Sequence, residues 1–160
     1  MHQTSYDLMK EFASKYVKGP CFVLDVGATL SSQNYGSIFT DCDYRTLSWD
    51  KGAHYQVEGY TWTNVPKDTF DVVISGQAFE HDKFFWLTLA NIREVCKPDA
   101  LVMIIVPSRG VVHRFPLDCY RFYEDARIPF SELLGADIVE TVWNEEIGWG
   151  DLGMVFRVKK

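Results

Sequence analysis

The sequence predicts one compact α/β domain, residues 1–160, built on a doubly wound and mostly parallel sheet. Three observations support this prediction. Segments 21–26, 70–75 and 100–106 are apolar along nearly their whole length, which indicates strands buried on both faces. Strand-like and helix-like segments alternate along the chain, as they do where helices cover both faces of a parallel sheet. The 160 residues are 47% hydrophobic, which is enough for one domain with a substantial core.

The first half of the chain is expected to contain one helix followed by strands. Residues 4–18 fit a helix, because Leu8, Phe12 and Tyr16 fall on one face and a Gly-Pro pair follows as a stop signal. The strands are expected, in chain order, at 21–26, 43–49, 54–58 and 70–75. The third of these segments has the weakest strand pattern.

The second half adds helices and ends in two strands. Residues 82–97 fit a helix with Asp82 as its N-cap and a Lys-Pro pair at its end. Beyond the third apolar strand, residues 124–135 are expected to be helical in part. Segments 137–144 and 153–159 fit two final strands joined as a hairpin. Because no long helix separates them, we expect one antiparallel strand at this end of a Rossmann-like sheet.

Composition and charge limit the classes of partner. The net charge of −6 argues against nucleic acid or an anionic membrane surface as the main partner. The N-terminal residues have no apolar core like that of a signal peptide, and the longest apolar run, 100–106, is too short to span a membrane. The four cysteines are scattered, without a CxxC motif or zinc-like Cys/His spacing. We therefore expect reduced thiols, a cytoplasmic location and no metal site.

Function is expected at the carboxyl ends of the parallel strands, where ligands of such sheets bind. The first apolar strand ends in Asp25 and is followed by Gly27. The glycine allows a tight turn and a close ligand approach, and the carboxylate can hold an ammonium group or the amides of the loop. A plain turn glycine is the alternative, because a single glycine is weak evidence for a cofactor loop.

The segment after the second strand suggests a ribose and base site. Ser48 stands where such sites place a carboxylate that accepts from both sugar hydroxyls, and Asp50 follows two residues later. Trp49 can stack on a purine face. The alternative is a surface turn with one core tryptophan.

The third and fourth strands are followed by further candidates. Three residues could meet an adenine edge: Glu58, Gly59 and Tyr60. Three more would line the reactive end of the ligand: Ser75, Gly76 and Gln77. Glu80 and His81 come next, just before the 82–97 helix. His81 is either a catalytic base or a residue packed on the sheet at the start of the helix.

Three stretches carry a family resemblance. They are VLDVGA at 23–28, FDVVISGQAFEHDKFFWLTLANIREVCKPDALVMIIVPS at 70–108 and HRFPLDCYRFYEDA at 113–126. Together they resemble the class I S-adenosylmethionine (SAM)-dependent methyltransferases, in the small methyltransferase-domain group, over roughly residues 20–126. The resemblance implies SAM as cofactor and methyl transfer to an acceptor. Carried over by position, it implies cofactor contacts from Asp25, Gly27, Ala28, Ser48, Glu58, Gly59, Ser75, Gly76 and Gln77.

The chain departs from the family pattern mainly around the cofactor. The second glycine of the first motif is absent, Ser48 replaces the ribose acid, and the adenine-side acid is shifted to Glu58. A hydrogen bond to a charged group contributes about 1.5–3 kcal/mol. We therefore expect SAM affinity to be ten- to a hundredfold weaker unless Asp50 substitutes for the missing acid.

Residues 108–122, here called the 108–122 loop, are predicted to form one wall of the acceptor site. They follow a central strand and combine charged residues with aromatic rings, a composition more often functional than structural in a loop on a rigid scaffold. Candidate substrate-binding residues for an anionic or sugar-like acceptor are Arg109, Arg114, Asp118 and Arg121. His81 and His113 are the candidate catalytic bases. An ordered loop held by Arg–Asp pairs is the alternative.

The leading functional hypothesis is therefore a SAM-dependent methyltransferase acting on a small molecule. A methyltransferase-like fold with a degraded site, serving as a binding or oligomerisation module, is the alternative. A nicotinamide-dependent oxidoreductase is a weaker third reading, because the GxGxxG fingerprint is absent. The chain is too short for a separate acceptor-binding domain, so either the site is open or a second subunit of a homodimer covers it.

Overall fold

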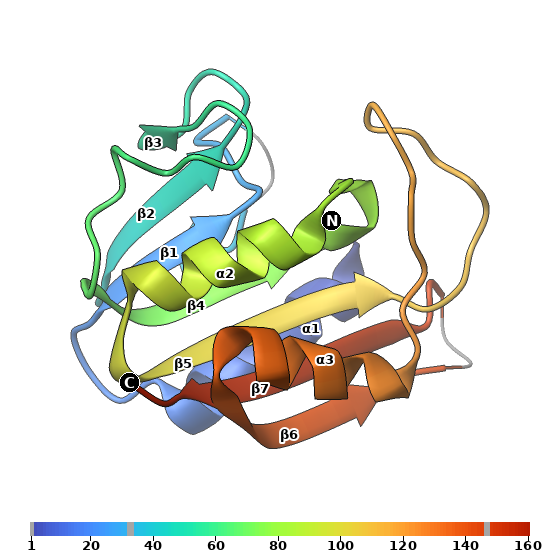
Figure 1. Cartoon of the computed structure of the whole chain (residues 1–160). Helices are drawn as coiled ribbons and strands as arrows, with labels where there is room; N and C mark the ends of the chain where they lie inside the picture. Colours follow the sequence, from blue (N-terminus) through green and yellow to red (C-terminus); the bar gives the residue numbers. More distant parts are fainter. Residues whose placement is uncertain (1, 32–33, 146–147) are drawn as a thin grey trace.

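The strands form one sheet that places the ends of β1, β2 and β4 side by side (Figure 1). The computed structural model describes residues 2–31, 34–145 and 148–160. Within them the sheet has seven strands in the order β3-β2-β1-β4-β5-β7-β6. The strands are β1 (Phe22–Val26), β2 (Asp43–Ser48), β3 (Tyr55–Gln56), β4 (Phe70–Gly76), β5 (Cys96–Pro107), β6 (Ala136–Trp143) and β7 (Asp151–Val158).

The sheet is parallel from β3 to β5, and β7 runs antiparallel to both of its neighbours. The predicted doubly wound, mostly parallel sheet with one antiparallel strand near its end is confirmed. So is the central position of the three apolar segments, since β1, β4 and β5 are adjacent. Val23 pairs with Val72 and Val73 pairs with Val102 in register. All four side chains are buried, as expected for strands covered on both faces.

Helices cover both faces of the sheet. Helix α1 (Gln3–Tyr16) lies behind the sheet in Figure 1, and α2 (Phe85–Val95) and α3 (Arg127–Leu134) lie in front of it. Leu8, Met9 and Phe12 of α1 join one core cluster. The second core cluster contains apolar residues of α2 and α3. Of the described helices, none has the length and apolar character needed to cross a bilayer.

The helix predicted at 82–97 is shorter in the structure, and Asp82 is not its N-cap. That position is occupied by Phe84, because Phe79–His81 form a separate 3₁₀ turn, η2, after which the backbone of Asp82 is extended. The Asp82 carboxylate instead accepts from the Phe84 amide at 3.0 Å and from the Thr88 hydroxyl at 2.5 Å. The Lys-Pro pair predicted to end the helix belongs to β5.

The other element boundaries lie close to the predicted ones. The segment 124–135 contains a short 3₁₀ turn, η3 (Glu124–Ala126), followed by α3. Strands β6 and β7 pair as predicted, although positions 146 and 147 of the expected hairpin connection lie outside the described residues.

Candidate functional site

A cavity of about 670 Å³ lies at the carboxyl ends of β1, β2 and β4. Its walls come from residues 25–28, from 47–50, from 76–82 and from 113–115 of the 108–122 loop. In Figure 1 the connections around β3 and the 108–122 loop rise beyond this edge of the sheet on opposite sides. The volume lies in the range of pockets that bind small molecules and cofactors. The cavity is therefore where the sequence predicted a ligand.

The end of β1 combines a strained turn with a buried acid. Gly27 has a φ of +94°, and a Cβ added there would lie 2.6 Å from the Cβ of Ala78, so only glycine fits. The amides of Gly27 and Ala28 both donate to the Leu47 carbonyl, which ties the turn to β2. Asp25 is 1% exposed and lines the cavity. It accepts from the Tyr44 hydroxyl, and burial raises its pKa to about 7.

The three candidates after β2 all reach the cavity. The Ser48 hydroxyl accepts from the Asp50 amide at 3.1 Å, so serine and acid lie side by side. The Trp49 ring is 45% exposed, and its Nε1 donates to the Gly59 carbonyl at 3.1 Å. The three residues predicted for the ribose side therefore lie together on the wall of the cavity.

The three candidates after β3 lie elsewhere. Glu58, Gly59 and Tyr60 are not among the residues that line the cavity, and Trp62 lines it instead. Glu58 is exposed and pairs with Thr61 across a tight turn. The Tyr60 hydroxyl donates to Asp82 at 2.5 Å. Gly59 and Tyr60 therefore contact residues of the cavity wall, Trp49 and Asp82, without lining the cavity themselves.

The end of β4 packs closely against the segment after β1. Ser75 does not line the cavity; it is buried and donates to the Val26 carbonyl at 2.8 Å, joining β4 to β1. A Cβ added to Gly76 would lie 2.0 Å from the Tyr35 hydroxyl. That hydroxyl is hydrogen-bonded to Ser5 of α1 at 2.6 Å. Tyr35 thus fills the space beside Gly76. Tyr35 itself belongs to the loop after β1, which lacks the second glycine of the family motif.

Gln77, directly after β4, connects the end of that strand to the start of β7. Its side-chain amide donates to Asp151 at 3.0 Å. Asp151, fully buried at the start of β7, also accepts from the Thr4 hydroxyl at 2.5 Å. His2 and Trp149 line the same wall of the cavity, with ring centroids 6.2 Å apart. The sequence did not predict these contacts, because no local pattern shows that the N-terminal residues lie against the start of the last strand.

Glu80 lies in the cavity wall, but the sequence suggested no role for it beyond its position next to His81. It lines the cavity with 0% exposure. Among the residues that the structure describes, neither carboxylate oxygen has a hydrogen-bond partner. Burial raises its pKa to about 7. Its backbone carbonyl accepts from the amides of Cys119 and Tyr120, which anchors the 108–122 loop beside the cavity.

The two candidate bases meet at the cavity. The rings of His81 and His113 are 4.8 Å apart, edge to face, and His113 also packs on Trp149 at 4.7 Å. His81 Nδ1 donates to the Leu117 carbonyl at 2.5 Å. Burial lowers the pKa of His81. The structure therefore assembles an imidazole pair from segments that are distant in the sequence.

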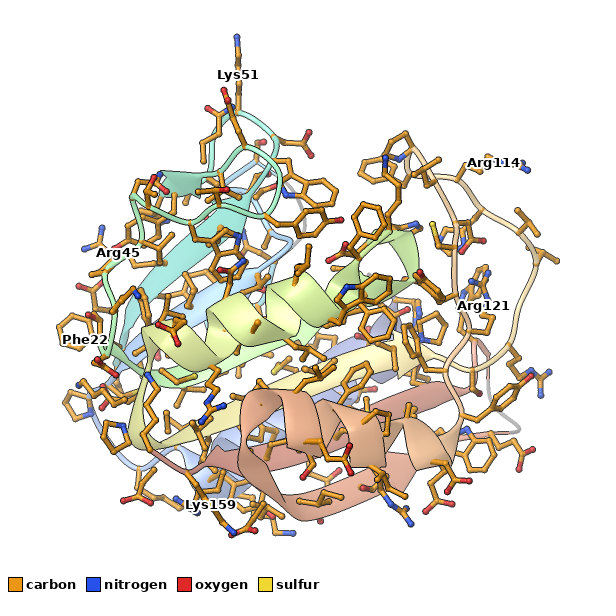
Figure 2. All side chains as sticks on the ribbon, viewed as in Figure 1. Phe22, Arg45, Lys51, Arg114, Arg121 and Lys159 are labelled. Atoms are coloured by element: carbon orange, nitrogen blue, oxygen red, sulfur yellow. The ribbon has the colours of Figure 1, made fainter. Side chains whose placement is uncertain are left out.

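The charged residues of the 108–122 loop divide into two groups. Arg121 donates to Asp118 through both terminal nitrogens, at 2.6 and 2.8 Å, and holds the pKa of that carboxyl far below its usual range. Arg109 donates to the Glu145 carbonyl. None of these three lines the cavity, whereas Arg114 does. In Figure 2 Arg121 lies between the two limbs of the loop and Arg114 lies near its tip. For Asp118 and Arg121 the geometry is thus that of a loop held by an Arg–Asp pair.

Comparison with known proteins identifies the fold. No family model and no curated protein matches the chain, but many solved structures do. The Burkholderia thailandensis 1,6-didemethyltoxoflavin-N1-methyltransferase, with bound 1,6-didemethyltoxoflavin and S-adenosylhomocysteine, has a TM-score of 0.75 and 15% identity, covering 98% of this chain and 79% of its own. A SAM-dependent methyltransferase from Aquifex aeolicus has a TM-score of 0.66 and 16% identity, covering 95% and 88%. One from Methanosarcina mazei has a TM-score of 0.73 and 11% identity, covering 92% and 97%.

The chain has the class I SAM-dependent methyltransferase fold. The resemblance drawn from the sequence motifs is confirmed at this level. At identities of 11–16% the likeness concerns the fold, and the methyltransferase activity has to be argued from the site itself.

Proposed function

We propose that this chain is a SAM-dependent methyltransferase that acts on a small-molecule acceptor. The observation that carries the proposal is the position of the cavity in this fold, at the carboxyl ends of β1, β2 and β4. The neighbours described as SAM-dependent methyltransferases, and the Burkholderia enzyme with its bound small molecule, support it.

The residues that line the cavity suit a cofactor of this chemistry. SAM carries a positive sulfonium and an ammonium group, and the buried carboxylate of Asp25 can compensate a cation. Ser48 and Asp50 can accept from ribose hydroxyls, and Trp49 and Trp62 offer faces for the adenine ring. These contacts come from side chains on strand ends, so the missing second glycine does not remove them.

The remaining wall supplies groups for the acceptor. When bound, the cofactor supplies an activated methyl group on sulfur. His81 Nδ1 carries a proton, because it donates to the Leu117 carbonyl, so the neutral ring keeps its lone pair on Nε2. A lowered pKa keeps this ring neutral near pH 7. His81 or His113 can therefore take a proton from a weakly acidic acceptor as it is methylated.

The proposal also includes a cytoplasmic location and a homodimer, with no nucleic acid or membrane as partner. The location rests on the cysteine pattern of the sequence, which has four scattered cysteines and no CxxC motif. Val111, Val112 and Phe115, on the loop beside the cavity, are 75%, 68% and 74% exposed. A second subunit would remove these apolar side chains from water.

Thermal stability with and without ligand tests the proposal. A ligand at one hundred times its Kd stabilises a protein by about 2.7 kcal/mol, so SAM and S-adenosylhomocysteine should raise the Tm, and NADH should not. Asp50→Asn should weaken the effect, whereas Asp41→Asn, at an exposed position, should not. No stabilisation by either compound at millimolar concentration would favour the degraded binding module over the enzyme.

A further inference from the structure

We propose that Glu80, His81 and His113 form a binding site for one divalent transition-metal ion of the Zn²⁺ class. Each residue offers one ligand atom, and these atoms all lie within 4.8 Å of one another. All three residues line the cavity. The sequence reading expected no metal because it searched for ligands at fixed spacing, whereas here the third ligand comes from the loop after β5.

The orientation of His81 points to a ligand between it and Glu80. A carbonyl oxygen only accepts hydrogen bonds, so the 2.5 Å contact to Leu117 places the ring proton of His81 on Nδ1. The lone pair is then on Nε2, which lies 3.6 Å from Glu80 Oε1. When Glu80 is ionised, two acceptors thus face each other without a donor between them. Two ligands of a tetrahedral Zn²⁺, each about 2.1 Å from the metal, lie about 3.4 Å apart.

The Glu80 carboxylate is the strongest single indication. It is 0% exposed, and within the described part of the chain neither of its oxygens has a hydrogen-bond partner. Buried carboxylates are normally paired with a cation, hydrogen-bonded, or bound to a metal. A metal ion bridging Glu80 and His81 would satisfy both the carboxylate and the bare imidazole nitrogen.

A carboxylate lies close to the His113 ring. Its Nδ1 is buried without a hydrogen bond to any described residue and lies 3.6 Å from Asp118 Oδ2. Asp118 is itself fixed by Arg121 and by the His113 amide. A carboxylate behind a histidine commonly orients its ring for a metal. Because Asp118 pairs with Arg121, an ionised Glu80 would leave a negative charge beside the two imidazoles, which favours a cation.

The donor set selects the class of ion. Two imidazoles and one carboxylate suit Zn²⁺ and its neighbours in the first transition row, whereas Mg²⁺ and Ca²⁺ prefer oxygen ligands throughout. Three protein ligands would leave one position of a four-coordinate ion free. When the metal is bound, the Nε2 lone pair of His81 is used for coordination, so His81 can act as a base only in the metal-free protein. The use of the free position for an acceptor oxygen rests on the proposed methyltransferase function, but the binding of the metal does not.

Calorimetric titration of the chelator-treated full chain with ZnCl₂, in the absence of SAM, tests the site. We expect one equivalent of Zn²⁺ to bind and MgCl₂ to give no binding. His113→Ala and Glu80→Gln should each weaken Zn²⁺ binding at least tenfold, since the loss of even an outer partner of a ligand costs about 10- to 100-fold in affinity. Two matched controls should keep the parent affinity: His54→Gln, outside the cavity, and Cys119→Ser, which removes an exposed thiol.

Three results would overturn the proposal: no Zn²⁺ binding, unchanged affinity in His113→Ala, or equal loss in the His54→Gln control. The His113 side chain is 40% exposed, so this variant should fold even if Glu80→Gln does not. Titration with Co²⁺ adds a second readout, the visible absorption of the bound ion, which the ligand variants should abolish. Zn²⁺ binding without SAM binding would refute only the proposed function, and the reverse result would refute only the metal site.

Discussion

Replacement of Asp25 by asparagine should make the free protein more stable at alkaline pH while weakening its hold on a cationic cofactor. Asp25 is 1% exposed, and its carboxylate accepts a hydrogen bond from the Tyr44 hydroxyl. Asparagine has almost the same shape and can still accept that hydrogen bond through its oxygen. The substitution therefore removes mainly the charge.

The magnitude follows from the pKa of Asp25, which burial raises from an ordinary value of about 4 to about 7. Between these two values the folded state holds a proton that the unfolded state has released, so stability falls as pH rises through this window. The full effect is roughly 4 kcal/mol, at about 1.36 kcal/mol for each tenfold change in proton affinity. Between pH 5 and pH 8 the advantage of Asp25→Asn over the parent should grow by roughly 3 kcal/mol.

Urea unfolding of both proteins at pH 5, 6, 7 and 8 measures this difference. Asp41→Asn is the matched control, because Asp41 is exposed, and its pH profile should parallel that of the parent. Calorimetry on the two folded proteins, without urea, should show SAM binding to Asp25→Asn weakened by about 1.5–3 kcal/mol. This is the contribution of a hydrogen bond to a charged group. If the stability of Asp25→Asn and that of the parent depend identically on pH, ionisation of the buried Asp25 carboxyl does not destabilise the folded protein, and the reasoning is refuted.

Three further outcomes are expected. Ser48→Asp should tighten SAM binding by about 1–2 kcal/mol in calorimetry; no change there, with a clear loss in Asp50→Ala, would assign the ribose role to Asp50. His113→Ala should cut turnover about a hundredfold with SAM affinity nearly unchanged, and parallel losses of SAM binding and Tm would mark His113 as structural. Gly76→Ala should destabilise the fold by about 1–3 kcal/mol, because its Cβ would lie 2.0 Å from the Tyr35 hydroxyl; an unchanged urea midpoint would contradict this packing.

Much of the fold could be read from the sequence. The unbroken apolar character of 21–26, 70–75 and 100–106 predicted strands buried on both faces, and the structure places these segments at the centre of the sheet. Hydrophobic burial acts on each segment separately, so a local pattern reports it. The rule that ligands lie at the carboxyl ends of parallel strands then located the cavity, with Asp25, Gly27 and Ser48 in its walls.

The finer composition of the site depended on the tertiary structure. Nothing near Asp151 in the sequence shows that it meets Gln77 and the N-terminal segment. Arg121 could have faced a substrate or a neighbour, and only the folded loop pairs it with Asp118.

The same distinction holds for the cluster of Glu80, His81 and His113. The sequence by itself determined which residues form strands and which follow them, because burial and turn geometry are local. Only the tertiary structure decided that the 108–122 loop folds back onto η2 and closes over Glu80. That contact joins segments far apart in the chain, and its free energy comes from packing and hydrogen bonds that exist only once the sheet has formed.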